Sequence, residues 1–518
     1  MLEEYEYQTC NDDDDEDDDI AAEYGTSIHK KKPSPKGGNK NQQQLADIPN
    51  FRLHWKGQQS LRPYQMEALR RMFTATTAAA NNKNPTTTTT AGRQCARSGV
   101  IVLPCGAGKT LTGIAAAARL RKSTVVLCTN AVSVRQWKEE FLHWTGLDES
   151  RVVTFTADLS KDATSMALSL DTIASGCVLI STYDMVAHKG PRAVQGQAMM
   201  DAMVQQDWGL LLLDEVHMAP AATFRLVVST IQSHVKLGLT ATLVREDDLI
   251  TDLHFLIGPK LYEANWMDLT NQGYLAKVKC VEVQCPMVPC FQEAYNNCSK
   301  KNTLMPSSSS KGKTSMRLQQ LLYVMNPEKI RAVEFLVRYH EQLGHKIILF
   351  SDLVEPLQTY AKILQRPMIY GDTVEMERQA VLQTFRQDKS GVQTICLSKV
   401  GDMSLNIPNA NVIIQVSSHF GARMQEAQRM GRILRPKQNN VPAYFYTLVS
   451  AGTKEVDFSQ KRRRYLEEHG YEYQIVTDLQ ERIAASDPPD AQTRGGYTFE
   501  TPEQDRGLLR ELLLEECD

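Results

Sequence analysis

Apolar and polar positions follow a block pattern from about residue 60 onward. Short apolar runs, each closed by polar residues or glycine, are separated by stretches with apolar residues at helical spacing, such as RQWKEEFLHW. Strands that alternate with helices along a chain pair in parallel sheets of the α/β class. The pattern therefore predicts an α/β domain over residues 60–265. Its expected strands are GVIVLP, TVVLCTN, CVLIST, WGLLLLDE and VKLGLTA.

A second alternation begins after about residue 325, with expected strands in HKIILFSD, PMIYG, QTICLSK and NVIIQVSS. It predicts a second α/β domain over residues 266–470, followed by a C-terminal extension over 471–518. The stretch SKKNTLMPSSSSKGKTSM lies between the two alternations, and its Ser and Lys content predicts a mobile or inserted segment. Two parallel-sheet domains leave a cleft between them, which is a favourable place for a ligand.

The segment before the first domain has a different composition. Residues 1–20 contain eleven acids and no Lys or Arg, and such a run is disordered by self-repulsion, so residues 1–59 are expected to form a disordered tail. Without these acids the net charge of −3 becomes +8 for the rest of the chain, a mildly basic balance that suits a nucleic-acid binder. The basic stretch HKKKPSPKGGNK is either a nuclear import signal or a solvated linker.

Two further compositional features narrow the class of protein. No apolar run approaches the roughly 20 residues of a membrane span, so no membrane association is expected. The eleven cysteines are scattered and form no Cys-x-x-Cys pair, which favours reduced thiols of an intracellular protein over a disulfide framework or a zinc site.

The first chemical motif is LPCGAGKTL, which follows the first expected strand and precedes a helical stretch. Glycines let backbone N–H groups close around phosphate oxygens at a helix N-terminus. Lys109 would reach the β- and γ-phosphates, and the Thr110 hydroxyl would bind Mg²⁺. Leu103 stands where the usual motif has its first glycine, so the strict pattern fails there. The expected nucleotide-contacting set is Pro104, Cys105, Gly106, Ala107, Gly108, Lys109, Thr110 and Leu111.

The second chemical motif closes the strand WGLLLLDE. Asp214 would hold Mg²⁺ directly or through water, and Glu215 would polarise the attacking water. A solvated strand end is the simpler alternative for either acid alone. Combined with a phosphate loop about a hundred residues upstream, the pair predicts an enzyme that hydrolyses a nucleoside triphosphate with Mg²⁺.

The motifs that follow resemble those of superfamily-two helicases. DEVH at 214–217, TAT at 240–242 and QRMGRILR at 428–435 occur in the order typical of that superfamily. The resemblance is specifically to the XPB family, the DNA-dependent ATPases and helicases of the transcription and repair factor TFIIH, and it extends from about residue 60 to about 480. It is carried by LRPYQ, LPCGAGKT, LDEVH, GLTATLVRED, IGPKLYEANW, SKVGD and QEAQRMGRILR.

The resemblance implies two RecA-like domains that close on ATP and Mg²⁺, with a thumb-like insert in the second domain near 286–325. It makes Gln65 the adenine reader with Arg62 in support, although a buried helix start explains Arg62 equally well. Arg432 and Arg435 match the arginine fingers that reach the γ-phosphate, and Gln428 lies one turn earlier on the same helical face.

The resemblance also implies residues that couple nucleotide state to DNA. The coupling set is His217, Thr240, Thr242, Gly401, Asp402 and Asn406. Asn406 stands where the family commonly has an acid, which predicts weaker coupling. The expected DNA contacts are Arg135, Thr182, Ser398 and Lys399, together with Arg245, Glu246 and Asp247 of the Arg-Glu-Asp element. A salt-bridged surface loop is the alternative for that element, and packing within a helix is the preferred interpretation for Trp137.

By resemblance the chain is expected to be a nuclear, 3′ to 5′ DNA helicase or translocase that opens duplex DNA in transcription initiation or nucleotide excision repair, with TFIIH subunits as partners. A regulatory paralogue that binds DNA or proteins with weak ATP turnover is the alternative, and an RNA helicase is disfavoured because the DEVH and Arg-Glu-Asp motifs are typical of the DNA group. Animal and fungal members carry a large N-terminal region, so residues 1–59 suggest a short paralogue or a shortened form.

Overall fold

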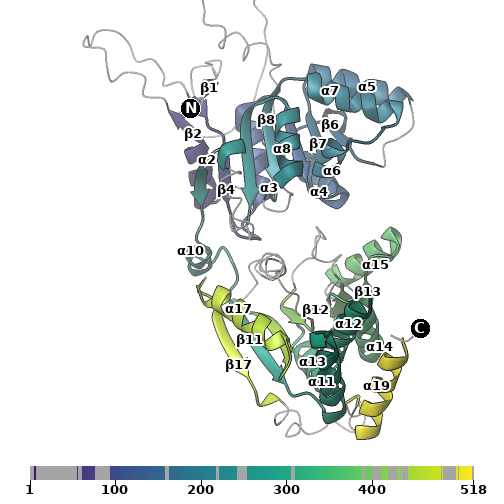
Figure 1. The fold of residues 1–518 in the computed structure, drawn as a ribbon. Coiled ribbons are helices and arrows are strands. Elements are labelled where there is room, and N and C mark those ends of the chain that lie inside the picture. Colours follow the sequence, from purple (N-terminus) through teal and green to yellow (C-terminus); the bar gives the residue numbers. More distant parts are fainter. Residues whose placement is uncertain are drawn as a thin grey trace, which may run out of the picture. The chain divides into compact units, whose positions relative to one another are not determined.

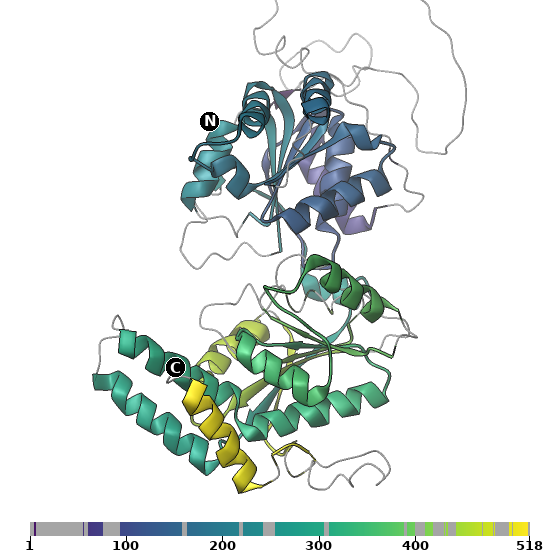
Figure 2. The same cartoon turned by 90° about the vertical axis from the view of Figure 1, so that its right-hand side faces the viewer.

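The computed structural model divides the chain into two compact units (Figures 1 and 2). The first contains residues up to Ala264 apart from Pro104–Ala107, and the second contains those four residues and Asn265–Asp518. The structure describes residues 5–6, 55, 61–75, 94–157, 163–216, 221–241, 254–304, 310–387, 391–398, 410–417, 429, 431, 433, 442–468, 470–479, 481, 497–499 and 501–515.

The first unit is built on a seven-stranded, wholly parallel sheet. Its strands, in order across the sheet, are β10 (Lys260–Glu263), β4 (Gly99–Val102), β9 (Ser233–Thr240), β8 (Trp208–Asp214), β5 (Thr124–Cys128), β7 (Val178–Thr182) and β6 (Val152–Phe155). The connecting helices include α2 (Pro63–Met72), α3 (Lys109–Leu120), α4 (Ala131–Trp144), α5 (Ala163–Ser175), α6 (Tyr183–Ala187), α7 (Val194–Gln205) and α8 (Ala221–Thr230).

Helices cover both faces of this sheet (Figure 2), which explains the uninterrupted apolar runs. Alternate residues of β8 point to opposite faces, so Leu211 and Leu213 pack with Phe224 of α8, whereas Leu212 faces α3. The close approach of α3 requires Gly113, because a Cβ there would lie 2.9 Å from Leu212, Leu239 and Trp137 side-chain atoms. The five strands expected in the first domain are all present.

The second unit repeats the design with another seven-stranded parallel sheet. The strand order is β13 (Met368–Ile369), β14 (Thr394–Leu397), β12 (Ile347–Phe350), β15 (Val412–Gln415), β16 (Ala443–Ser450), β11 (Val278–Cys285) and β17 (Glu472–Val476). The described helices are α10 (Trp266–Asn271), α11 (Pro289–Leu304), α12 (Ser310–Val324), α13 (Pro327–Gln342), α14 (Val354–Leu364), α15 (Glu375–Arg386), α17 (Glu455–Glu468) and α19 (Pro502–Glu515). The predicted class, α/β with two parallel-sheet domains, is therefore confirmed.

The segment near 286–325, predicted to hold a thumb-like insert, contains the helices α11 and α12, which pack on each other and on α19. The polar stretch within it is flanked by apolar residues that enter the core of the second unit. Phe291 and Tyr295 of α11 and Leu322 of α12 are members of that core. These apolar anchors explain how a Ser/Lys-rich region still has helices that pack against the domain.

Two parts of the segment 1–59 have described positions. Tyr5–Glu6 forms the strand β1, which joins β2 (Phe73–Ala75) and β3 (Gln94–Ala96) in a small antiparallel sheet. Trp55 forms a β-bridge with Thr145, and its ring stacks on that of Trp144 at a centroid distance of 5.9 Å. Among the described residues, no helix has the length and apolar character needed to cross a membrane.

Candidate nucleotide-binding site

Three adjacent strands of the first unit end side by side, and each end carries one of the predicted motifs. β9 lies between β4 and β8, and all three run parallel, so their carboxyl ends meet at one edge of the sheet. β4 leads into the phosphate loop, β8 ends at Asp214 and β9 ends at Thr240. The Leu103 amide donates to the Thr240 carbonyl at 3.0 Å, which joins the start of the loop to the end of β9. The carboxyl edge of a parallel sheet is where α/β proteins bind ligands.

The phosphate loop has the backbone conformation that its glycines allow. Gly106 and Gly108 have φ of 82° and 86°, in the left-handed region that favours glycine. The Ala107 amide donates to the Pro104 carbonyl at 3.0 Å, which closes the turn, and α3 begins directly after Gly108. The first N–H groups of an α-helix point out of its N-terminus, where they can donate to phosphate oxygens.

Gln65 of α2 lies against this loop. Its Nε2 donates to the Gly108 carbonyl at 3.3 Å, and a Cβ at Gly108 would lie 2.5 Å from the same nitrogen. The Gln65 Oε1 accepts a hydrogen bond from the Arg62 amide at 2.9 Å, so both polar atoms of the side-chain amide have partners. Arg62 is half-buried at the start of α2, and its Nη1 donates to the Tyr64 hydroxyl at 3.1 Å. Gln65, the predicted adenine reader, thus lies beside the loop, and Arg62 contacts Gln65.

The predicted phosphate-binding lysine and the predicted catalytic acid form an ion pair. Lys109 Nζ lies 3.0 Å from Glu215 Oε1, and their side chains are 11% and 21% exposed. Glu215 has a φ of 48°, a left-handed conformation that is costly for a residue with a side chain. This turn redirects the chain at the end of β8, so Glu215 faces the lysine. A triphosphate at the loop would compete for Lys109 and thereby release the Glu215 carboxylate.

Asp214 is held by two aromatic residues. Trp137 Nε1 of α4 donates to Asp214 Oδ2 at 2.8 Å, and the Tyr183 hydroxyl donates to the Asp214 carbonyl at 2.8 Å. Burial and the neighbouring Glu215 raise the pKa of Asp214 to about 6, although the Trp137 hydrogen bond and the Lys109 charge oppose the shift. A buried carboxylate that is costly to ionise would be stabilised by a bound cation.

This donor set fits Mg²⁺ with a bound triphosphate. Mg²⁺ is commonly held by one or two protein oxygens, with water and phosphate oxygens completing its shell. The Asp214 carboxylate and the half-buried Thr110 hydroxyl, in the first turn of α3, would supply the protein ligands. Within the described ranges no group of three or more His, Cys, Asp or Glu side chains could hold a metal by itself. Phosphate oxygens and water would complete the shell of the metal.

Comparisons with known proteins point to one family. A family model described as "ERCC3/RAD25/XPB C-terminal helicase" matches residues 269–518, and one described as "Type III restriction enzyme, res subunit" matches 58–245. The TFIIH helicase/translocase subunit XPB of Schizosaccharomyces pombe is 47% identical over 434 residues, which are 83% of this chain and 48% of that protein. The zebrafish subunit, from Danio rerio, is 45% identical over 470 residues, 90% of this chain and 53% of that protein. The chain belongs to the XPB helicase family.

The chain spans about half the length of the curated family members that it matches. In Dictyostelium discoideum the subunit is 48% identical over 434 residues, which are 83% of this chain and 49% of that protein. The model matched over 58–245 covers most of the first unit, and the model matched over 269–518 covers nearly all of the second. The family therefore accounts for both parallel-sheet units.

The residues predicted to contact DNA and described by the structure lie in different environments. Thr182 at the end of β7 is buried, and its hydroxyl accepts a hydrogen bond from the Met185 amide, which caps α6. Ser398, directly after β14, is buried, and its amide donates to the Ile369 carbonyl at 3.1 Å. Arg135 on α4 is exposed. Of these three, Arg135 alone presents its side chain at the surface.

Among the coupling residues, Thr240 is described, and it is fully buried at the end of β9. Twelve predicted site residues lie outside the described residues, and their assignments remain those of the family resemblance. They are His217, Thr242, Arg245, Glu246, Asp247, Lys399, Gly401, Asp402, Asn406, Gln428, Arg432 and Arg435.

Sequence reasoning missed the two aromatic residues that hold Asp214. Trp137 was expected to pack within its helix, and it is 1% exposed beside Phe141, with a ring-centroid distance of 6.0 Å. Its hydrogen bond to Asp214 spans 77 residues of sequence, and that of Tyr183 spans 31. No local pattern signals these contacts. A polar ring atom on a buried residue is the one available hint, because a buried Trp N–H usually finds an acceptor.

Proposed function

We propose that this chain is an ATP-dependent DNA helicase or translocase of XPB type. The chain would bind Mg-ATP at the phosphate loop, and hydrolysis would drive movement along DNA in the 3′ to 5′ direction. The observation that carries the proposal is the convergence of Lys109, Asp214 and Glu215 at one edge of the sheet, directly beside a glycine loop and a helix N-terminus. The family membership supports ATP and DNA as its substrates.

Each residue of this edge has a defined task in the proposal. The loop amides and Lys109 would bind phosphate oxygens, while Thr110 and Asp214 would hold Mg²⁺, which would neutralise charge that develops on the transferred phosphoryl group. Glu215, adjacent to the metal ligand, would accept a proton from the attacking water. Gln65 would read the base. Arg432 and Arg435 would supply the positive charge that stabilises the transition state.

The wider role is proposed from the named relatives. They are TFIIH subunits, so we infer that this chain acts in the nucleus on DNA during transcription initiation, nucleotide excision repair or both, with TFIIH subunits as partners. The Arg-Glu-Asp element at 245–247 would act at the DNA junction. It would therefore contribute more to duplex opening than to ATP hydrolysis itself. The regulatory paralogue is not favoured, because the three residues needed for turnover are present and close together.

The test is ATP turnover by the full chain with and without duplex and single-stranded DNA. Lys109→Ala removes the phosphate contact, and Glu215→Gln removes the proton acceptor while keeping the size of the side chain. Each should lower kcat about 100-fold or more, because each removes a transition-state interaction or the acid–base group. Wild type should be stimulated by DNA.

Lys138→Ala is the matched control for these variants. Lys138 is on α4 of the same unit, and it pairs at the surface with Glu149 at 2.6 Å. This variant should turn over ATP like wild type, since an exposed pair contributes little. DNA-independent turnover, or equal rates in wild type and the Lys109 variant, would contradict the motor function and leave the regulatory paralogue.

A further inference from the structure

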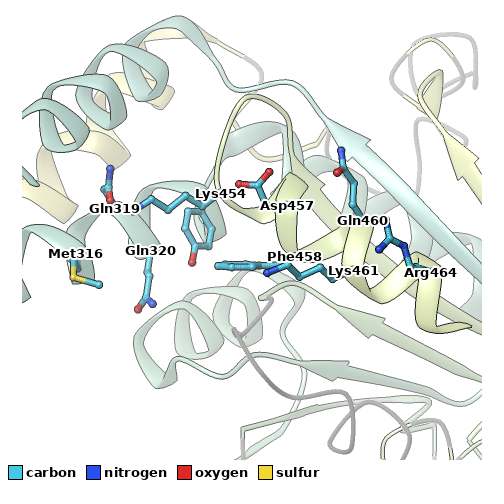
Figure 3. Close-up of a pocket in the computed structure, with 10 residues that line it drawn as sticks. Met316, Gln319, Gln320, Lys454, Asp457, Phe458, Gln460, Lys461 and Arg464 are labelled. Atoms are coloured by element: carbon cyan, nitrogen blue, oxygen red, sulfur yellow. The ribbon is translucent and has the colours of Figure 1, made fainter. Parts of the chain in front are cut away.

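A groove of about 820 Å³ opens between α12 and α17 of the second unit (Figure 3). Its described lining belongs entirely to this unit and shares no residue with the candidate nucleotide site. The lining consists of Met316, Gln319, Gln320, Tyr323, Lys454, Asp457, Phe458, Gln460, Lys461 and Arg464.

Helix α17 divides its two faces between the core and the groove. Ser459, Arg462 and Leu466 are buried on the inner side. Lys454, just before the helix, and Phe458, Lys461 and Arg464 follow one another at intervals of three or four residues. Side chains at that spacing share one helical face, and this face lines the groove. The groove side of α17 is thus basic with one aromatic ring.

Helix α12 supplies the opposite wall with the same spacing. Met316, Gln319, Gln320 and Tyr323 lie within two turns on one face. Met316 is 43% exposed, whereas Tyr323 is 4% exposed. Together with Phe458 they form an apolar floor, and the glutamine amides lie beside it as hydrogen-bonding groups. An exposed methionine in a groove is typical of surfaces that accept apolar side chains of a partner.

The groove is held in shape from below by a buried ion pair. Lys329 Nζ lies 2.7 Å from Oε2 of Glu455, the first residue of α17, and both side chains are fully buried. The same Nζ lies 5.9 Å from the centre of the Tyr323 ring. The Tyr323 carbonyl accepts a hydrogen bond from the Ser450 hydroxyl at 2.7 Å. These contacts anchor both walls to β16, so the groove is formed before any partner arrives.

The charged side chains at the rim of the groove indicate which kind of partner the groove would bind. Lys454, Lys461 and Arg464 contribute three positive charges, and Asp457 contributes one negative charge. Lys454 and Lys461 are seven residues apart, which is about 10 Å along a helix, and Arg464 lies about 5 Å further. We propose that this groove docks an acidic amphipathic segment of a partner protein, with an apolar side chain on the floor and carboxylates beside the three cations.

A protein segment fits these features better than a nucleic acid does. Single-stranded nucleic acid binds along continuous basic grooves with aromatic faces open for base stacking. Here the Tyr323 ring is almost fully buried, and Asp457 would repel a passing phosphate. An amphipathic helix in a groove uses apolar anchors at i, i+3, i+4 and i+7, which matches the spacing on both walls. Complementary charge at the rim would fix the register of the helix.

The test measures peptide binding to the full chain by fluorescence anisotropy. One labelled helical peptide carries Glu residues spaced to meet the three cations, with Leu and Phe on the adjacent face. A second has Gln in place of every Glu, and a third is a scrambled version of the first. The first peptide should bind more tightly than the other two, and its affinity should fall as salt rises.

Variants of the chain locate the binding. Lys461→Gln combined with Arg464→Gln should weaken the acidic peptide about 5- to 20-fold, since two rim charges are lost. Phe458→Ser should weaken it to a similar extent by removing the floor, and thermal unfolding checks that this variant folds. Arg463→Gln is the matched control, because Arg463 is on the same helix, pairs with Glu467 and does not line the groove. It should bind like wild type.

Three outcomes would overturn the proposal. The first is no binding of the acidic peptide up to about 1 mM. The second is equal loss in the Arg463 control and the groove variants, which would indicate general electrostatic attraction. The third is that a labelled thymidine oligonucleotide displaces the peptide and loses affinity in the same groove variants, which would make the groove a nucleic-acid surface. ATP turnover without DNA should be unchanged in all variants, so failure here is distinct from failure of the motor function.

Discussion

At the scale of single residues, the ionised Asp214 carboxylate lowers the stability of the fold, yet the proposed function requires it to hold Mg²⁺. Its pKa is raised to about 6, mainly by burial, against a usual value near 3.8. A carboxyl whose folded-state pKa is raised binds its proton more tightly in the folded chain than in the unfolded chain. The cost to stability is absent below about pH 3.8 and fully present above about pH 6. At neutral pH the chain therefore retains a charged group that opposes its folding.

Asp214→Asn should remove that cost while abolishing metal binding. Asn keeps an oxygen that can accept from Trp137, so the fold should be stabilised at pH 7 by roughly 1 to 3 kcal/mol. The measurement is thermal or urea unfolding without Mg²⁺ at several pH values. The advantage over wild type should shrink as pH falls from about 6 toward 3.8. A variant less stable than wild type at pH 7 would show that the ionised carboxylate stabilises the metal-free fold.

Trp137 holds Asp214 in position, so substituting it should change the Mg²⁺ requirement of ATP hydrolysis. Trp137→Phe keeps the aromatic packing but removes the N–H donor at 2.8 Å from Asp214 Oδ2. Groups that orient a metal ligand typically change metal affinity 10- to 100-fold, so the Mg²⁺ concentration for half-maximal ATP hydrolysis should rise about tenfold.

Trp208→Phe is the control for that variant. Trp208 is also buried in the first unit, and its Nε1 donates to the Met203 carbonyl at 2.8 Å, away from the phosphate loop. This change should lower stability without altering the Mg²⁺ requirement. Equal shifts in the two variants would mean that Trp137 contributes only to packing.

At the scale of elements, the start of α17 depends on a buried charge. Glu455 pairs with Lys329, and its Oε2 also accepts from the Ser450 amide at 2.8 Å. Burial raises the pKa of Glu455, and the Lys329 charge opposes that shift. Lys329 donates a further hydrogen bond to the Val416 carbonyl at 3.1 Å. One ion pair thus joins α13, α17, the segment after β15 and the end of β16.

Lys329→Met should destabilise the second unit by about 3 to 5 kcal/mol, because it leaves the Glu455 carboxylate buried without its counter-charge. Combining it with Glu455→Leu should recover much of the loss, since replacing a whole buried pair by apolar residues is often tolerated. Urea unfolding of the two variants and wild type measures the difference. A double variant less stable than the Lys329 single variant would show that Glu455 stabilises α17 through contacts other than its ion pair with Lys329.

Strands that are continuous apolar runs could be predicted from the sequence. Strands whose polar residues are satisfied by distant partners could not. β5, β7 and β8 are continuous apolar runs and were expected, as was the strand before the phosphate loop. β11 was not, because its sequence VKCVEVQC mixes polar and apolar residues. Glu282 within it is buried and accepts a hydrogen bond from the Tyr473 hydroxyl at 2.6 Å, 191 residues away. Such tertiary partners cannot be read from a local pattern.

Some features of the candidate site could likewise be predicted from the sequence, and others could not. The phosphate loop and the acids after β8 are contiguous motifs, so their chemistry could be predicted from the residues alone. The lysine–glutamate contact, the left-handed Glu215 and the support from Trp137 arise only when three strands and α4 are brought together. The spacing of the motifs along the chain does not indicate these contacts.

At the scale of the whole molecule, charge is distributed unevenly along the chain. Residues 1–20 hold eleven acids, and the rest of the chain has a net charge of +8. DNA is a polyanion, and basic groups that replace its counterions give binding a strong dependence on salt. An acidic segment tethered to a basic body raises the local concentration of competing anions. If the chain acts on DNA as proposed, its own acidic segment should weaken that interaction at low salt.

Replacing the eleven acids by Asn and Gln tests this while keeping chain length. The DNA concentration that half-maximally stimulates ATP hydrolysis should fall about 3- to 10-fold at low salt, and the difference should vanish near 1 M, where charges are screened beyond about 3 Å. Replacing Lys30, Lys31, Lys32 and Lys36 by Gln is the opposing control and should raise that concentration. Turnover without DNA should be equal in all three proteins, because neither change touches the phosphate loop. An unchanged DNA requirement at low salt would show that the acidic segment does not compete with DNA and serves another purpose, such as solubility.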